Sequence, residues 1–115
     1  MSTTPANLRA YDAAVDRIKL WIHKAHKNQP LDFSSLTDLN MLPPIPHGVK
    51  ILNISNTAIE ELDDLPPTFE ELWMSNSKVN VISVDLPITL KSIYCKNTPL
   101  TEKPQLPPSI VRAVF

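Results

Sequence analysis

One phrase of about 20 residues recurs along the chain and constrains its fold more than any other feature. Three copies align over residues 49–68, 69–89 and 90–109, a weaker copy precedes them at 31–48, and a partial copy closes the chain at 110–115. Repeats of this length stack as successive turns of a solenoid, because a single turn cannot bury its own apolar side chains. The 115 residues therefore predict one structural domain of about four turns.

The three full copies agree at the positions that a short strand and its turn require. With Val49, Phe69 and Leu90 as position 1, positions 4, 6 and 11 are apolar, position 8 is Asn, position 9 is Thr or Ser, and Leu-Pro stands near the end of the copy. Side chains alternate along a strand, so positions 4 and 6 are predicted to point inward and positions 3, 5 and 7 outward. Position 11 and the Leu of each Leu-Pro should complete the core. Proline restricts its own backbone and the residue before it, which predicts an extended return arm.

Residues 6–28 follow a helical period instead. Apolar residues recur at the spacing of one helix face, and Pro30 limits the helix at its C-terminal end. We expect residues 1–30 to form an N-terminal helical cap on the repeats at 31–115. The residues expected to be buried against the first repeat are Leu8, Val15, Ile18, Trp21 and Ile22.

The consensus L-x-x-L-x-L-x-N-T-x-I-x-x-L-x-x-L-P resembles a leucine-rich repeat. Its short period and Leu-Pro ending are similar to the bacterial YopM/IpaH class of type III secreted effectors, in which an amphipathic helical region also precedes the repeats. The resemblance implies an α/β solenoid, with a parallel concave β-sheet, extended return arms and an N-terminal helical cap. It also implies a non-catalytic module that binds a host protein. Nothing in the sequence corresponds to the ubiquitin-ligase domain of IpaH-type proteins, so that activity is not expected.

The order of Asn and Thr departs from the family pattern. Family members usually carry Asn at position 9, where its amide bonds the turn backbone in a ladder. Here position 9 holds a hydroxyl residue, and Asn stands one place earlier, at Asn56, Asn76 and Asn97. Since a hydroxyl can also bond a neighbouring backbone group, we expect a hydroxyl ladder of Thr57, Ser77 and Thr98, with Asn near the concave rim. A one-residue shift that restores Asn to the ladder is the alternative.

The outward positions form the predicted binding surface. Trp73 and Tyr94 occupy the same position on adjacent strands, about 5 Å apart at the backbone. Large aromatic side chains are typical of binding hot spots, because they bury much area with little loss of rotamer freedom. Alternatively, the two rings only cover the sheet or pack on each other. The predicted protein-binding residues are Asn53, Ser55, Glu71, Trp73, Ser75, Tyr94, Lys96 and Arg112.

No pattern of catalytic or metal-binding side chains stands out, and we expect no enzyme activity, cofactor or metal. His23 and His26 lack the further ligands that zinc requires. Cys95 occupies inward position 6, so a buried packing role is expected rather than a nucleophilic one. The single glycine, Gly48, excludes a Gly-rich phosphate loop, and a net charge of −1 predicts no general attraction to nucleic acid.

A second hypothesis concerns the final segment, Ile110–Phe115. Its apolar, β-branched sequence predicts an edge strand that favours association. The chain would then be a cytoplasmic structural or regulatory subunit, or a homodimer, joined through this edge. No apolar run approaches the ~20 residues that cross a bilayer, and the polar N-terminus does not read as a signal peptide. We therefore expect a cytoplasmic protein or one delivered into a host cell by a specialised secretion system. Whether the chain is a fragment of a longer repeat protein stays open.

Overall fold

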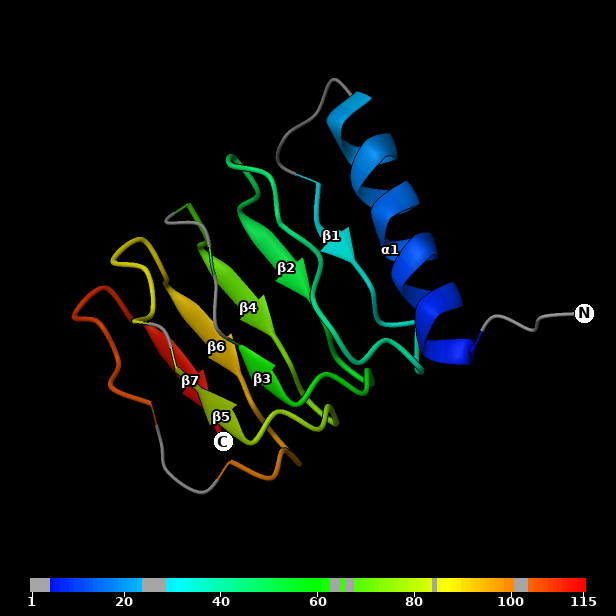
Figure 1. The fold of residues 1–115 in the computed structure, drawn as a ribbon. Helices are drawn as coiled ribbons and strands as arrows, with labels where there is room; N and C mark the ends of the chain where they lie inside the picture. The colour runs from blue at the N-terminus through cyan, green and yellow to red at the C-terminus, as the bar shows by residue number, and fades with distance from the viewer. Residues whose placement is uncertain (1–4, 24–28, 63–64, 66–67, 84, 101–103) are drawn as a thin grey trace, which may run out of the picture.

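The computed structural model describes residues 5–23, 29–62, 65, 68–83, 85–100 and 104–115. These residues form a parallel β-solenoid of about four turns, with one helix at one end of the stack (Figure 1). The five-stranded sheet has the order β1-β2-β4-β6-β7, and β3 and β5 pair separately. The elements are α1 (Ala6–His23), β1 (Leu31–Asp32), β2 (Ile51–Asn53), β3 (Glu61–Leu62), β4 (Glu71–Trp73), β5 (Val81–Ile82), β6 (Ser92–Tyr94) and β7 (Arg112–Val114).

Strand pairing follows the repeat alignment residue by residue. The position-4 residues form one continuous row across the sheet, in the order Leu31, Leu52, Leu72, Ile93 and Ala113. The central residue of β2, β4 and β6 is buried, and its two neighbours are half-buried. A shift of the pairing by one residue would move the inward side chains of a strand to its outer face. The pairing therefore confirms the predicted parallel stacking and, for the three full copies, the predicted inward and outward positions, whereas Ala113 at the end of the row is exposed.

The return arms are partly regular as well. Glu61 pairs with Val81 and Leu62 with Ile82 in a parallel arrangement, and the backbone N–H of Ser83 donates to the carbonyl of Leu62 at 2.9 Å. The sequence predicts only extended arms here. The two short strands β3 and β5 give successive turns a second line of backbone hydrogen bonds, on the arm that returns to the main sheet.

Helix α1 packs on the first turn through a face that differs from the predicted one. Its buried residues are Ala10, Ala14, Ile18 and Trp21. Burial of Ile18 and Trp21 confirms part of the prediction. The predicted burial of Leu8 and Ile22 is wrong, since these side chains are 51% and 48% exposed. Val15 is half-buried. The small alanines allow the helix backbone to approach the first turn closely. Helix α1 ends at His23, and residues 24–28 of the predicted helix lie outside the described part of the chain.

Polar contacts also join α1 to the first turn. The Arg17 guanidinium donates from Nη1 to the carbonyl of Asp32 at 2.8 Å and from Nη2 to Oγ of Ser35 at 2.6 Å. Trp21 donates from Nε1 to the carbonyl of Gln29 at 2.9 Å. These bonds hold the helix in one orientation on an interface whose apolar part combines two alanines with Ile18 and Trp21.

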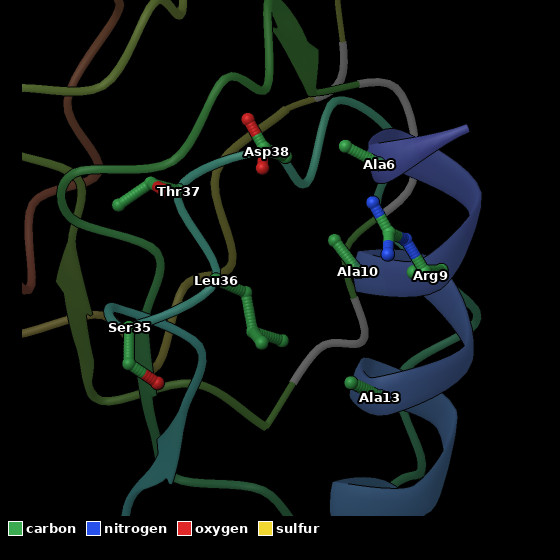
Figure 2. Close-up of a pocket in the computed structure, with 8 residues that line it drawn as sticks. All are labelled: Ala6, Arg9, Ala10, Ala13, Ser35, Leu36, Thr37 and Asp38. Atoms are coloured by element: carbon green, nitrogen blue, oxygen red, sulfur yellow. The ribbon is translucent and has the colours of Figure 1, made fainter. Parts of the chain in front are cut away.

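A groove of about 250 Å³ remains between the N-terminal half of α1 and the segment that follows β1. Figure 2 shows its two walls, with the alanines and Arg9 on the helix side and Leu36 and Asp38 on the other. Apolar methyl groups and two opposite charges line the same space. The groove lies at the helix end of the solenoid, away from the predicted binding residues on β4 and β6.

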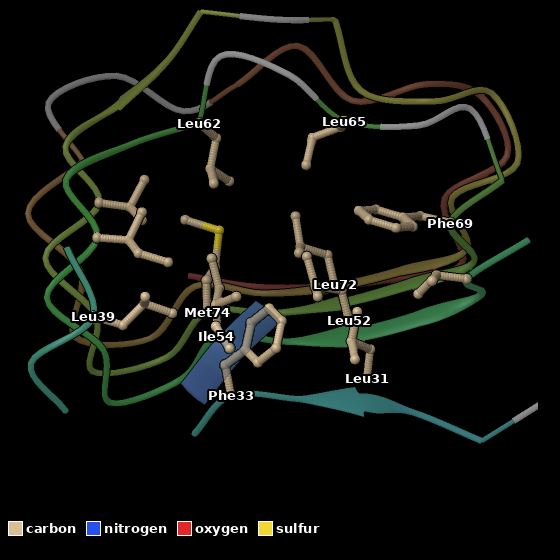
Figure 3. Close-up of a cluster of buried hydrophobic side chains, with 14 of the residues drawn as sticks. Leu31, Phe33, Leu39, Leu52, Ile54, Leu62, Leu65, Phe69, Leu72 and Met74 are labelled. Carbon is tan, nitrogen blue, oxygen red and sulfur yellow. The ribbon is translucent and has the colours of Figure 1, made fainter. Parts of the chain in front are cut away.

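The hydrophobic core runs through the inside of the stacked turns (Figure 3). Positions 1, 4 and 6 of the three full copies are all buried, including Cys95 as predicted, and Phe33 and Leu39 bring the weaker first copy into the same core. The Leu-Pro leucines Leu65 and Leu86 are buried too.

Two core predictions for the last full copy are wrong. Leu106, the leucine of its Leu-Pro, is 36% exposed, and Leu100 at position 11 is only half-buried. In the earlier copies the next turn covers these positions. Among the described residues, only the short segment around β7 follows this copy, so part of its inner surface stays open.

The Asn at position 8 is required by the turn that ends each strand. Its backbone φ is positive in every full copy: 64° at Asn56, 59° at Asn76 and 61° at Asn97. Thr57 N donates to the carbonyl of Ile54 at 3.4 Å, which closes a four-residue turn with Asn in third place. A turn with positive φ at its third residue takes Gly or Asn, because other side chains clash with the backbone there. Asn thus performs in this nearly glycine-free chain what glycine performs elsewhere.

The residue after Asn forms the predicted hydroxyl ladder. Thr57 and Ser77 are only 2% and 3% exposed. The hydroxyls of Thr57, Ser77 and Thr98 each donate at 2.7 Å to the carbonyl three residues earlier. The hydroxyl hypothesis is confirmed, and the alternative of a one-residue shift is wrong, since the Asn side chains lie on the exposed side of the turn.

A second row of hydroxyls was not predicted. The last residue of each full copy, Thr68, Thr89 or Ser109, donates to the carbonyl at position 1 of the same copy, at 3.0, 2.6 and 2.7 Å. The signal was present in the sequence, because every full copy ends on Thr or Ser. Each full copy therefore has one hydroxyl bond within the turn after its strand and a second that ties its last residue to its first.

Candidate protein-binding face

The predicted binding residues lie in rows on the outer side of the five-stranded sheet. One row pairs Asp32, Asn53, Trp73, Tyr94 and Val114 in that order. A second row pairs Ile51, Glu71, Ser92 and Arg112. We call these two rows, together with the residues Ser55, Ser75 and Lys96 that follow the strands, the sheet face. Ser92 was not among the predicted residues, although its register with Glu71 and Arg112 places it in the same row.

Trp73 and Tyr94 form a stacked pair at the centre of the sheet face. Their ring centroids lie 3.8 Å apart and the ring planes differ by 15°. The predicted adjacency is confirmed, and the rings do pack on each other, as the alternative interpretation held. Both side chains are nevertheless only half-buried. Mutual packing therefore leaves part of a rigid apolar surface open to solvent.

The part of the sheet face near α1 is occupied by local hydrogen bonds. Oδ1 of Asp32 accepts from the backbone N–H of Ser34 at 2.8 Å, and Oδ1 of Asn53 accepts from the N–H of Ser55 at 3.0 Å. These side chains fold back on the end of their own strand. Asn53 and Ser55 consequently have a local structural role that the sequence prediction did not include. On β4 and β6 the aromatic rings replace Asp and Asn at the same position.

The charged residues divide the sheet face. Glu71 is half-buried on β4, whereas Lys96 and Arg112 are exposed on the side toward β7. Within the described ranges, neither Lys96 nor Arg112 forms an ion pair. One position before the strands, Glu70 lies 3.1 Å from Lys91 and 3.9 Å from Lys50, so that row is charge-balanced. On the sheet face as described, the cations without a carboxylate partner are therefore Lys96 and Arg112, beside Tyr94.

Metal binding and a reactive cysteine find little support in the described residues. Among them, no group of three or more His, Cys, Asp and Glu side chains is placed to hold a metal ion. Cys95 is 1% exposed, and burial raises the pKa of its thiol to about 12, which keeps it protonated at neutral pH. Within the same residues, α1 is not apolar enough over its length to cross a bilayer. His26, which was considered as a zinc ligand, lies outside the described residues.

Comparison with known proteins assigns no family to the chain. No protein-family model matches it, and no curated protein matches it either. The sheet face, with its aromatic stack and its uneven charge, is the feature on which a functional inference can rest.

Proposed function

We propose that this protein is a non-catalytic leucine-rich repeat module that binds a partner protein on its sheet face. The observation that carries the proposal is the part-exposed stack of Trp73 and Tyr94 at the centre of a parallel sheet. Stacked rings have already lost their rotamer freedom before a partner arrives, so their apolar surface can be covered at little entropic cost. The resemblance to the YopM/IpaH class supports the same function, with a host protein as partner and delivery by a specialised secretion system.

The leucine-rich repeat assignment has support from the spacing of the turns. Each of the three full copies contributes one strand to the main sheet and one turn closed by a hydroxyl bond, and the first two also contribute a short strand on the return arm, in the order that the consensus implies. We assign α1 as the cap of this solenoid, because it buries Ala14 and Trp21 at the β1 end of the stack. A cap of this kind shields the apolar side of a terminal repeat from solvent.

Binding can be tested by affinity capture and titration with matched variants. Trp73→Ala and Tyr94→Ala should each weaken binding of a captured partner by about 2 kcal/mol, the loss that defines a hot-spot residue. Val81→Ala removes a 46% exposed apolar side chain from β5, away from the sheet face, and should leave binding unchanged. Circular dichroism and thermal melting monitor the fold of each variant. A large loss of stability with intact binding would assign the rings a structural role and overturn the proposal.

A second candidate function follows from β7. All three of its residues are exposed, as are the neighbouring Val111 (84%) and Phe115 (40%). An apolar strand with an open hydrogen-bonding edge favours pairing with another chain. In this candidate, Ile110–Phe115 joins the protein to a larger assembly or to a second copy. Light scattering should then show association that rises with concentration and that Ala113→Pro abolishes. A strict monomer at high concentration would rule out self-association through this edge.

A further inference from the structure

The cationic residues nearest the aromatic stack lie on both sides of Tyr94 along the strand direction. Lys96 follows Tyr94 by two residues at the end of β6. Arg112 lies on β7 and pairs with Ser92, which precedes Tyr94 by two residues. A strand rises about 3.3 Å per residue and neighbouring strands lie about 4.8 Å apart, so the two cationic residues are separated by about 14 Å at the backbone. The tyrosine ring thus lies between two positive charges along the strand direction.

Lys96 and Arg112 have no carboxylate partner among the described residues. A lysine nearby does have one. Lys91 is engaged by Glu70 at 3.1 Å. Glu71 shares a row with Arg112 but stands two strands away, about 10 Å at the backbone. Glu71 and Arg112 both pair with Ser92, so they lie one strand to either side of β6. The sheet face is therefore acidic on its β4 side and cationic on its β7 side and beyond Tyr94. Opposite charges on a partner are the complement of such a surface.

An extended peptide matches the spacing. Alternate residues of an extended chain face the same side, and residues four apart lie about 13 Å from each other. If a peptide runs over β6 on its β7 side with an apolar side chain on the aromatic stack, the residues two places before and two places after lie near Arg112 and Lys96. The half-buried Glu71 then lies on the other side of β6. Carboxylates at these places would each meet one cation.

We infer that the partner presents an extended acidic segment in which an apolar or aromatic residue is flanked, two places away on each side, by Asp or Glu. This inference rests on the proposed function, since it names the kind of segment that the sheet face binds. The central residue contacts the stack of Trp73 and Tyr94, and the flanking carboxylates pair with Lys96 and Arg112. A net charge of −1 favours a peptide over a nucleic acid, because the chain lacks the broad positive field that a phosphate backbone requires.

The test uses the whole chain and synthetic peptides. Calorimetry compares a peptide with the core Glu-Thr-Phe-Thr-Glu with the neutral peptide Gln-Thr-Phe-Thr-Gln. The acidic peptide should bind about fivefold or more tightly at low ionic strength, and the difference should shrink with added salt. Lys96→Gln and Arg112→Gln should each reduce this preference. Lys19→Gln, which removes the same charge from an exposed site on α1, should not.

Three results would overturn the inference. These are equal binding of the two peptides, no binding of the acidic peptide, and tighter binding of a single-stranded oligonucleotide that depends on Lys96 and Arg112. Failure of the inference can be distinguished from failure of the proposed function. If binding of a protein partner is weakened by Trp73→Ala but unchanged by Lys96→Gln and Arg112→Gln, the proposed function holds and the acidic segment is rejected.

Discussion

The side-chain amide of Asn97 donates to the side-chain carbonyl of Asn76 at 2.9 Å, joining equivalent places on consecutive turns. Both residues also have positive φ, at 61° and 59°. Asn therefore meets two requirements at position 8: its backbone accepts the left-handed conformation, and its side chain can bond the same residue of the next turn. Glycine would meet only the first requirement.

Substitution at Asn76 should separate these two contributions. Asn76→Ala loses the side-chain bond and strains the backbone, and should lower the free energy of unfolding by about 1–2 kcal/mol. Asn76→Gly keeps the backbone conformation and should cost less. Chemical denaturation measures both. Asn80→Ala, at an exposed asparagine whose φ is not positive, is the control and should be near neutral. Equal losses for Ala and Gly would show that the backbone is unstrained.

Removing a buried hydroxyl should lower the free energy of unfolding more than removing an exposed one. Thr57→Val removes the hydroxyl that donates to the carbonyl of Ile54 in a site that is 2% exposed. The expected loss is about 1 kcal/mol of stability, because a buried acceptor loses one of its two donors. Thr37→Val changes an exposed threonine in the same way and should have little effect. A neutral result at Thr57 would mean that the backbone N–H alone satisfies the turn.

The observed face of α1 predicts an unusual pattern of substitution effects. Ala14 is fully buried, so Ala14→Leu should overpack the interface and cost about 1–3 kcal/mol, although leucine is a strong helix former. Leu8→Ala removes a larger side chain that is half exposed and should cost well under the ~2–5 kcal/mol of a core leucine. Thermal melting of the two variants gives the comparison. A larger loss of stability for Leu8→Ala than for Ala14→Leu would instead support the helix face predicted from periodicity.

Cys95 should make stability depend on alkaline pH. Burial raises the pKa of its thiol from 9.0 to about 12, so between these values the thiol ionises in the unfolded chain but not in the folded one. Its contribution is complete below pH 9 and is lost as pH rises toward 12. By pH 10.5 the loss should be about 2 kcal/mol, at 1.36 kcal/mol per pH unit.

Comparison with Cys95→Ala isolates this effect from the other groups that titrate at high pH. The variant should be less stable at pH 8, because a cavity forms, but its stability should fall less between pH 8 and pH 10.5. Thiol-specific reagents should label the native protein slowly and the unfolded protein quickly. Parallel pH profiles for the two proteins would contradict the burial of the thiol.

Much of the solenoid could be predicted from the sequence because its information is repeated. An inward position that is ambiguous in one copy is settled by the same position in the others, and the pairing of Leu52, Leu72 and Ile93 shows the result. The adjacency of Trp73 and Tyr94 followed from the same alignment. Their stacking did not, since ring orientation depends on side-chain packing and not on register.

The buried face of α1 was harder to predict, because the helical pattern occurs only once in the chain and no second copy can be compared with it. Periodicity ranks large side chains as core residues, and Leu8 and Ile22 were chosen for this reason. The actual contact uses Ala10 and Ala14, whose value lies in how closely they let two backbones approach. The local bonds of Asp32 and Asn53 escaped prediction for a similar reason. Their side chains were assigned to solvent by alternation, while short polar groups at a strand end can also turn back on the backbone.

The unbroken register of the position-4 row has a consequence for how such a chain can change in length. Removing residues 69–89 deletes one whole turn, joins Thr68 to Leu90, and would bring Tyr94 beside Asn53 with every inward residue still inward. Removing a single residue from a strand would instead expose its core side chains. Gene duplication or loss can therefore add or subtract complete turns, and each such event changes which side chains lie next to one another along the outer rows of the sheet.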